Sequence, residues 1–138
     1  MFTKKFLRTS DSWSPLVLRI AVGIVMCAHG LQKLGYLGGP GWDGVIQFMG
    51  SLGIPAAVAG LVIIAESLGG AALVLGLFTR FCAAAIAVIM LGAIILVHAK
   101  NGLLGQGGFE LPFVILGSCI ALMLAGGGKW SIDRMIVK

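Results

Sequence analysis

The chain has 138 residues, of which 59% are hydrophobic and only 11% are charged, and its mean hydropathy is +1.06. A soluble domain of average composition has about 45–50% apolar and about 25% charged residues, so too little charge is present to cover a surface that faces water. The composition excludes an ordinary soluble domain and predicts an all-α integral membrane protein.

Four apolar stretches are predicted as membrane-spanning helices, because about 20 mostly apolar residues cross the hydrocarbon core. Ser14 is the expected N-cap of the first helix, with Pro15 at its first helical position. We expect a single domain, residues 1–138, built as a four-transmembrane-helix bundle. In chain order, the predicted helices cover about residues 15–34, 54–78, 81–98 and 109–125.

The segments between the helices are short. Residues 35–44 form a Gly-rich loop, and the following "VIQFMGSLG" is expected to be a short interfacial segment. Thr79 and Arg80 are expected to form the turn between the second and third helices. The basic "MFTKKFLR" is similar to the start of a signal peptide, but polar residues 11–14 interrupt it and no small-x-small cleavage site follows. We interpret it as a retained interfacial arm.

The net charge of +5 is distributed asymmetrically, which predicts the orientation of the chain. With both termini cytoplasmic, most Lys and Arg fall on the cytoplasmic side, as the positive-inside rule requires. The charge is explained by the anionic lipid surface, so we expect no nucleic-acid partner. The residues on that side are Lys4, Lys5, Arg8, Arg80, Lys129, Arg134 and Lys138, against Lys33 and Lys100 on the other.

The three cysteines do not suggest a redox pair. Cys27, Cys82 and Cys119 lie in three different apolar stretches, and no C-x-x-C motif is present. Membrane thiol oxidoreductases exchange disulfides through neighbouring cysteines, so that class is disfavoured. We interpret the cysteines as small hydrophobic side chains.

Ionisable side chains inside apolar helices are rare and mark functional sites by default. Glu66 is the most informative, because it stands at the middle of the second span, where a carboxylate costs about 3 kcal/mol to insert. The complete set is Arg19, His29, Lys33, Glu66 and His98, with Glu110 at the start of the fourth span.

The opposite directions of the first two helices bring candidate partners toward Glu66. His29 and Lys33 share one helix face, and side chains tilt toward the N-terminus of their own helix, which closes much of a depth difference of about 9 Å. We expect an outward-half cluster of His29, Lys33, Glu66 and His98, with Glu110 near its mouth, as a candidate ligand site. Simpler roles stay open: a protonated Glu66 bonded across helices, a Lys33 that extends to lipid headgroups, and a His98 that merely ends a helix.

Arg19, Arg80 and Asp133 are assigned structural or topological roles. Arg19 stands about one turn above the inner surface and is expected to reach lipid phosphates or to pair with Asp133 in "SIDR". Arg80 is expected to anchor the topology from the tight inner turn.

Several segments together resemble the DoxX family of small bacterial four-helix membrane proteins. They are "LRIAVGIVMCAHGLQKLGYLGG", "FMGSLGIP", "AESLGGAALVLGLFTR", "ILVHAK" and "SIDR", which cover essentially residues 16–134. The resemblance implies a multi-pass protein of the bacterial inner membrane. The family name comes from a quinol-oxidase-associated subunit, and a relative forms part of a thiosulfate:quinone oxidoreductase. The matching positions carried forward are Arg19, His29, Lys33, Glu66, Arg80 and His98.

The leading hypothesis is an integral subunit or accessory of a quinone-linked redox system, with the quinone headgroup at the polar cluster. His29 or His98 would exchange a proton, Glu66 would orient or relay it, and Lys33 would stabilise an oxyanion. The sequence has no haem-attachment motif, no Fe–S cysteine spacing and no nucleotide fingerprint. We therefore expect redox chemistry to need a larger partner protein, and we assign no catalytic residue within this chain.

Two other function classes stay open. The first is non-catalytic: a scaffold for larger partners, or a transporter of a small or lipidic molecule. Four short helices leave little room for alternating access except in a homo-oligomer. The second is a haem or metal site with His29 and His98 as ligands. It ranks lower, because two histidines on separate helices are common without a metal.

Overall fold

The computed structural model describes residues 2–138, and every regular element in that range is helical. Strands are absent from this part of the chain, which confirms the all-α class. The elements are α1 (Phe2–Phe6), α2 (Ser14–Lys33), α3 (Gly41–Ser51), α4 (Ala56–Leu75), α5 (Thr79–Ala93), the π-helical turn η1 (Ile94–His98), the 3₁₀ turn η2 (Ala99–Asn101), α6 (Glu110–Ala125) and α7 (Ile132–Val137).

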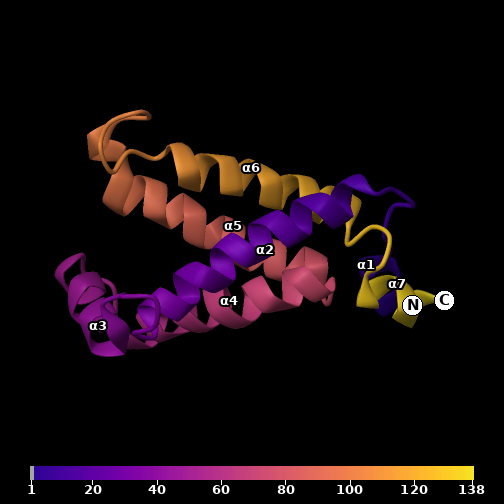
Figure 1. The fold of residues 1–138 in the computed structure, drawn as a ribbon, viewed down its shortest axis with the longest axis horizontal. Helices are drawn as coiled ribbons and strands as arrows, with labels where there is room; N and C mark the ends of the chain where they lie inside the picture. The colour runs from indigo at the N-terminus through magenta and orange to yellow at the C-terminus, as the bar shows by residue number, and fades with distance from the viewer. Residues whose placement is uncertain (1) are drawn as a thin grey trace.

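The helices α2, α4, α5 and α6 follow the long axis of the molecule (Figure 1). α3 lies at one end, whereas α1, α7 and both chain termini lie at the other. α2 and α4 run in opposite directions and make the most extensive contact, and α5 packs on α6 and on α4. The fully buried side chains Ile86, Cys119 and Leu122 lie in the core between these helices, beside Met26 and Leu73.

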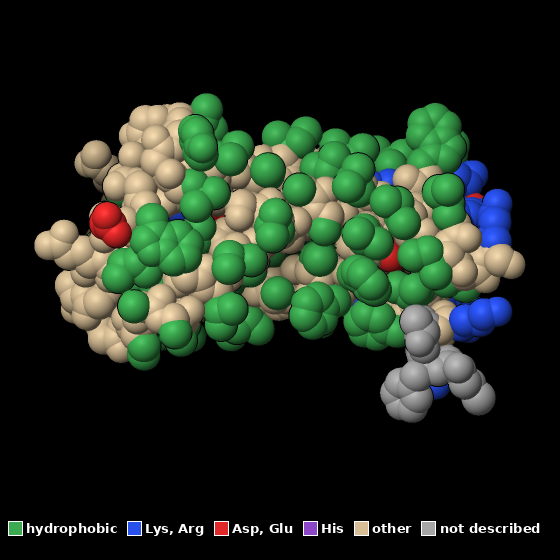
Figure 2. Space-filling model, turned by 90° about the horizontal axis from the view of Figure 1, so that it is seen from below, with side chains coloured by type: hydrophobic (Ala, Val, Ile, Leu, Met, Phe, Trp, Pro, Cys, Tyr) green, Lys and Arg blue, Asp and Glu red, His purple; other side chains and the backbone are tan. Residues whose placement is uncertain are grey.

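The outer surface of the helices is apolar. Val88 and Leu124 are 70% and 76% exposed, and green side chains cover most of the flank in Figure 2, with Lys and Arg gathered at the end that holds the termini. Such a continuous apolar surface is unfavourable in water and suits a lipid bilayer. α2, α4 and the segment Thr79–Asn101 are long and apolar enough to span a membrane, whereas Glu110–Ala125 is a shorter apolar helix.

The turn between α4 and α5 differs from the prediction. Gly76 adopts a left-handed conformation with φ of +69° and ends α4. Thr79 and Arg80 are then the first residues of α5 rather than the turn. The reason is a cap supplied from a distant part of the chain: the Asp133 carboxylate accepts hydrogen bonds from the backbone N–H of Phe78 (2.7 Å) and of Thr79 (2.8 Å).

The C-terminal segment closes against the N-terminal one. The Ser10 N–H donates to the Ala125 carbonyl at 2.9 Å. Arg134 donates to the Asp11 carboxylate at 2.6 Å. This hydrogen bond, together with the positive charge of Arg134, holds the pKa of Asp11 below its ordinary value. The residues that follow the predicted basic arm are therefore bonded to the end of α6 and to α7.

Candidate functional site

Lys33 and Glu66 form an ion pair between α2 and α4, with the lysine ammonium donating to Oε2 of the carboxylate. Glu66 is 2% exposed as a residue, and the Lys33 side chain is 22% exposed. The expected proximity of these two charges is confirmed. Each charge offsets part of the desolvation penalty of the other, which explains how both are tolerated inside an apolar bundle.

The close approach of α2 and α4 places this pair. A Cβ atom added at Gly30 would stand 2.5 Å from the backbone of Ser67, and one added at Gly70 would stand 2.5 Å from the backbone nitrogen of Cys27. The absence of side chains at these glycines lets the two backbones touch, as in other small-residue contacts of membrane helices. Glu66 lies one turn from Gly70 and is thereby held within reach of Lys33.

A cavity of about 230 Å³ opens beside the ion pair. His29, Lys33, Glu66 and His98 all line it, from α2, α4 and the η1 turn. The structure thus brings together the four residues of the predicted cluster. We refer to this space as the interhelical cavity. Its apolar walls are Met26, Met90, Ala93, Leu111, Pro112 and Ile115.

His98 owes its position to irregular backbone. The last turn of the third predicted span is a π-helix, Ile94–His98, and η2 and a loop follow it. π-Helical turns are uncommon and occur frequently at functional sites. The Nδ1 atom of His98 is 2.7 Å from the Gly107 carbonyl oxygen. A carbonyl only accepts, so Nδ1 carries the proton, and in the neutral ring Nε2 is left as an acceptor.

A second cavity of about 440 Å³ adjoins the first and shares His29 and Lys33 with it. We call it the α3 cavity, because its other walls come mainly from α3 and the residue before it. These walls are Gln32, Pro40, Gly44, Val45, Phe48 and Met49. The interfacial helix, predicted only as a short segment near residues 45–53, therefore covers the polar cluster from one side.

Glu110 is not part of the cluster. It is exposed at the first position of α6 and does not line the interhelical cavity. The following turn of α6 contributes Leu111 and Pro112 instead. The prediction placed Glu110 at the correct end of the bundle, because the next two residues line the cavity. The Glu110 side chain itself is exposed and does not line the cavity.

Arg19 differs from both sequence expectations. It is 1% exposed, so it does not reach lipid phosphates, and it forms no ion pair with Asp133 among the described residues. Its guanidinium instead donates to backbone carbonyls at the end of α4 and in the segment before α7. The acceptors are the carbonyl oxygens of Leu73, Val74, Gly127, Lys129 and Trp130. Arg19 is thus a buried structural cross-link.

Arg80 also binds backbone. It donates to the Met123 carbonyl and, through Nε and Nη2, to the Arg8 carbonyl at 3.3 and 2.9 Å. It lies at the end of the molecule that holds the termini, and its role as a topology anchor stays a prediction. Within residues 2–138, His, Cys, Asp and Glu side chains form no group of three or more that would hold a metal ion, and the three cysteines are free thiols.

Sequence reasoning missed the apolar walls of the cavity and the helical extent of α3. Met90 and Ile115 were indistinguishable from other core residues in an apolar stretch, and only the packing of α5 on α6 brings them to the cluster. For α3, the signal was present: Pro40 and Gly41 precede a run in which apolar residues recur at helical spacing.

The family model described as DoxX matches residues 14–99, which include α2, α4, α5 and η1. All four residues that line the polar side of the interhelical cavity lie within that match. The match ends before α6, which contributes part of the apolar wall.

Curated relatives extend the similarity over nearly the whole chain. "Putative oxidoreductase CatD" of Bacillus subtilis is 34% identical over 123 residues, which are 89% of this chain and 87% of the relative. An uncharacterized membrane protein of Mycobacterium tuberculosis is 34% identical over an alignment of 147 positions, which covers 97% of this chain and 88% of the relative. The inner membrane protein YqjF of Escherichia coli is 32% identical over an alignment of 127 positions, which covers 89% of this chain and 92% of the relative. No solved structure matches significantly.

Proposed function

This chain belongs to the DoxX family of membrane proteins, and on that premise we propose that it is an integral subunit or accessory of a redox system and binds a quinone or quinol headgroup in the interhelical cavity. One observation carries the proposal: a partly buried ion pair and two histidines line one small cavity whose remaining walls are apolar. The oxidoreductase name of one relative agrees with it.

The polar groups match what a quinol headgroup needs. In the neutral ring, Nε2 of His98 is available as a proton acceptor for a ring hydroxyl, because Nδ1 is engaged by Gly107. The ammonium of Lys33 has further protons beyond the one donated to Glu66 and stabilises negative charge on a ring oxygen. His29 lines both cavities and is a second group through which a proton is exchanged.

The sizes of the two cavities suggest how the ligand is divided between them. The interhelical cavity, about 230 Å³, is smaller than the about 300–1,000 Å³ of sites for drug-sized ligands. It suits a single substituted ring rather than a whole lipid-soluble molecule. The adjoining α3 cavity, about 440 Å³ and lined in part by Val45, Phe48 and Met49, accommodates the first part of the tail.

The electrons of such a ligand are exchanged with a partner protein in this proposal. The chain contributes binding, orientation and proton exchange, and a larger oxidoreductase contributes the electron carrier. The cavity lies near the end of the bundle that holds α3, so we place the partner at that end.

We further propose that α6 forms a fourth span, so that residues 1–138 form one membrane domain in the bacterial inner membrane with both termini cytoplasmic. The 16 residues of α6 extend about 24 Å, somewhat less than a hydrocarbon core of about 30 Å. Local thinning of the bilayer accommodates a shortfall of that size. The cluster of Lys and Arg at the end that holds the termini (Figure 2) supports the orientation.

The binding proposal is tested with purified full-length protein and short-tail ubiquinone and menaquinone analogues in equilibrium binding measurements. Wild-type protein is expected to bind at least one analogue. Glu66→Gln and His98→Gln are each expected to weaken binding tenfold or more, because each removes a hydrogen bond or charge that is worth about 1.5–3 kcal/mol.

Glu110→Gln is the matched control for Glu66→Gln, because it makes the same chemical change at an exposed glutamate outside the cavity. Its affinity is expected to equal that of the wild type. His98→Gln keeps the test decisive if Glu66→Gln fails to fold. Absence of binding by the wild type, or equal affinities for His98→Gln and the control, would overturn the proposal.

A further inference from the structure

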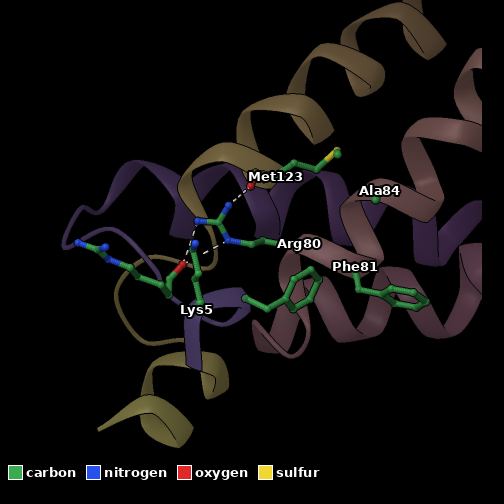
Figure 3. Close-up of a pocket in the computed structure, with 7 residues that line it drawn as sticks. Lys5, Arg80, Phe81, Ala84 and Met123 are labelled. Carbon is green, nitrogen blue, oxygen red and sulfur yellow. Dashed lines mark hydrogen bonds between the residues drawn. The ribbon is translucent and has the colours of Figure 1, made fainter. Parts of the chain in front are cut away.

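A cleft of about 800 Å³ lies at the opposite end of the molecule from the polar cluster, between α1 and the helices α5 and α6 (Figure 3). Three basic residues line it: Lys5, Arg8 and Arg80. Its remaining lining is apolar and consists of Phe6, Phe81, Ala84 and Met123. We call this space the terminal cleft. It shares no residue with the interhelical cavity, so nothing in the proposed function explains it.

The charges of Lys5 and Arg80 converge in this cleft without an acidic partner. The Lys5 side chain extends toward the Arg80 guanidinium in Figure 3. No Asp or Glu lines the cleft, and neither residue belongs to an ion pair formed within residues 2–138. Like charges brought together repel each other, and an anion bound between them would relieve that repulsion.

Arg80 is held in place for such a contact. Its bonds to the Met123 and Arg8 carbonyls use neutral acceptors, so they fix the guanidinium without neutralising it. The N–H groups that these carbonyls do not engage remain able to donate. A fixed, charged guanidinium is a strong binding group for a phosphate oxygen.

The apolar part of the cleft distinguishes a lipid from a soluble anion. Phe81 is 65% exposed and Phe6 is 46% exposed. In a chain embedded in a bilayer, the adjacent surfaces of α5 and α6 face lipid chains rather than water. A ligand that fills the cleft therefore combines a negative headgroup with hydrocarbon, and a basic pocket against membrane helices is typical of anionic lipid sites.

We propose that the terminal cleft is a binding site for an anionic glycerophospholipid. The phosphate lies between Lys5 and Arg80. The part of an acyl chain nearest the headgroup packs against Phe81, Ala84 and Met123. α1 closes the site from the side of the membrane surface, so the bound lipid joins the N-terminal arm to α5 and α6.

The test is a lipid titration of the detergent-purified full chain, read by native mass spectrometry as the fraction with one lipid bound. The probes are phosphatidylglycerol and phosphatidylcholine with identical acyl chains, and soluble glycerol phosphate as a competitor. Phosphatidylglycerol is expected to bind more tightly than phosphatidylcholine. Lys5→Gln is expected to weaken phosphatidylglycerol binding about fivefold, which corresponds to about 1 kcal/mol for one cation at the lipid surface. Lys5→Glu is expected to weaken it further, because the new carboxylate pairs with Arg80.

Lys4→Gln and Lys4→Glu are the matched controls, since Lys4 lies on the same short helix and is exposed but does not line the cleft. They are expected to retain wild-type affinity. Equal losses in the Lys4 and Lys5 variants, or equal binding of the two lipids, would overturn the proposal. Full displacement of the lipid by glycerol phosphate would also overturn it, because the hydrocarbon would then contribute nothing.

Discussion

Among single residues, Lys33 and Glu66 show most directly how sequence predicts the site. Their meeting followed from helix direction and side-chain tilt alone, because both lie in regular helices. Arg19 shows the opposite case. Most of its carbonyl partners belong to residues 127–130, which lie outside regular helix, and helical periodicity does not position such a segment.

The ion pair predicts a compensating double substitution. Lys33→Met or Glu66→Gln alone is expected to lower the free energy of unfolding by about 2–3 kcal/mol, because each leaves one polar partner buried without the other. The value lies below the about 3–5 kcal/mol of a fully buried pair, since Lys33 stays partly exposed. The double variant is expected to recover at least half of the summed loss. Unfolding by sodium dodecyl sulfate in mixed micelles measures all four proteins, and strictly additive losses would refute the coupling.

Among the helices, the α2–α4 contact determines the geometry of the site, because the cluster depends on how closely the two backbones approach. The sequence predicted both helices to within a few residues. It did not predict which glycines lie at the contact between the two backbones. Gly69 and Gly70 are neighbours, yet only Gly70 faces α2. The π-helical turn before His98 was equally invisible, because Ile94–His98 reads as ordinary apolar helix.

Gly70→Ala is expected to destabilise the protein by about 1–3 kcal/mol and to weaken quinone-analogue binding. Its Cβ would stand 2.5 Å from the Cys27 nitrogen and 2.9 Å from the Gly23 carbonyl oxygen, both backbone atoms that move only with their helix. Gly69→Ala is the control, because its Cβ would meet only Ile86 Cδ1, at 3.9 Å. That variant is expected to be as stable as wild type or slightly more so, since alanine favours helix. Equal stabilities of the two variants would contradict the close contact.

The whole molecule is polarised along its long axis, with the candidate quinone site and α3 toward one end and the basic cluster with both termini at the other (Figures 1 and 2). Composition predicted the membrane class, and the asymmetry of Lys and Arg predicted an orientation. The number of spans depends on α6, the shortest of the four axial helices.

Reporter fusions decide between three and four spans. Green fluorescent protein joined after Lys138 is expected to fluoresce, and alkaline phosphatase joined after Leu104, in the loop before α6, is expected to be active. This pattern places the two positions on opposite sides of the membrane, as a spanning α6 requires. If the phosphatase fusion at Leu104 is active but the C-terminal fluorescent fusion is dark, α6 does not cross and the four-span proposal fails.

The carbonyl cross-link of Arg19 has a consequence for how the protein is made. Arg19 emerges from the ribosome with the first span, but its acceptors at Gly127, Lys129 and Trp130 are synthesised 108 or more residues later. Until they arrive, a guanidinium lies in the membrane without its full set of partners, a state that costs several kcal/mol. A chain interrupted after Ala125 would contain every long helix, but its Arg19 guanidinium would still lack most of its carbonyl partners. We therefore expect a chain cut after Ala125 to accumulate less in the membrane than the full chain, because its Arg19 guanidinium lacks the carbonyls of Gly127, Lys129 and Trp130.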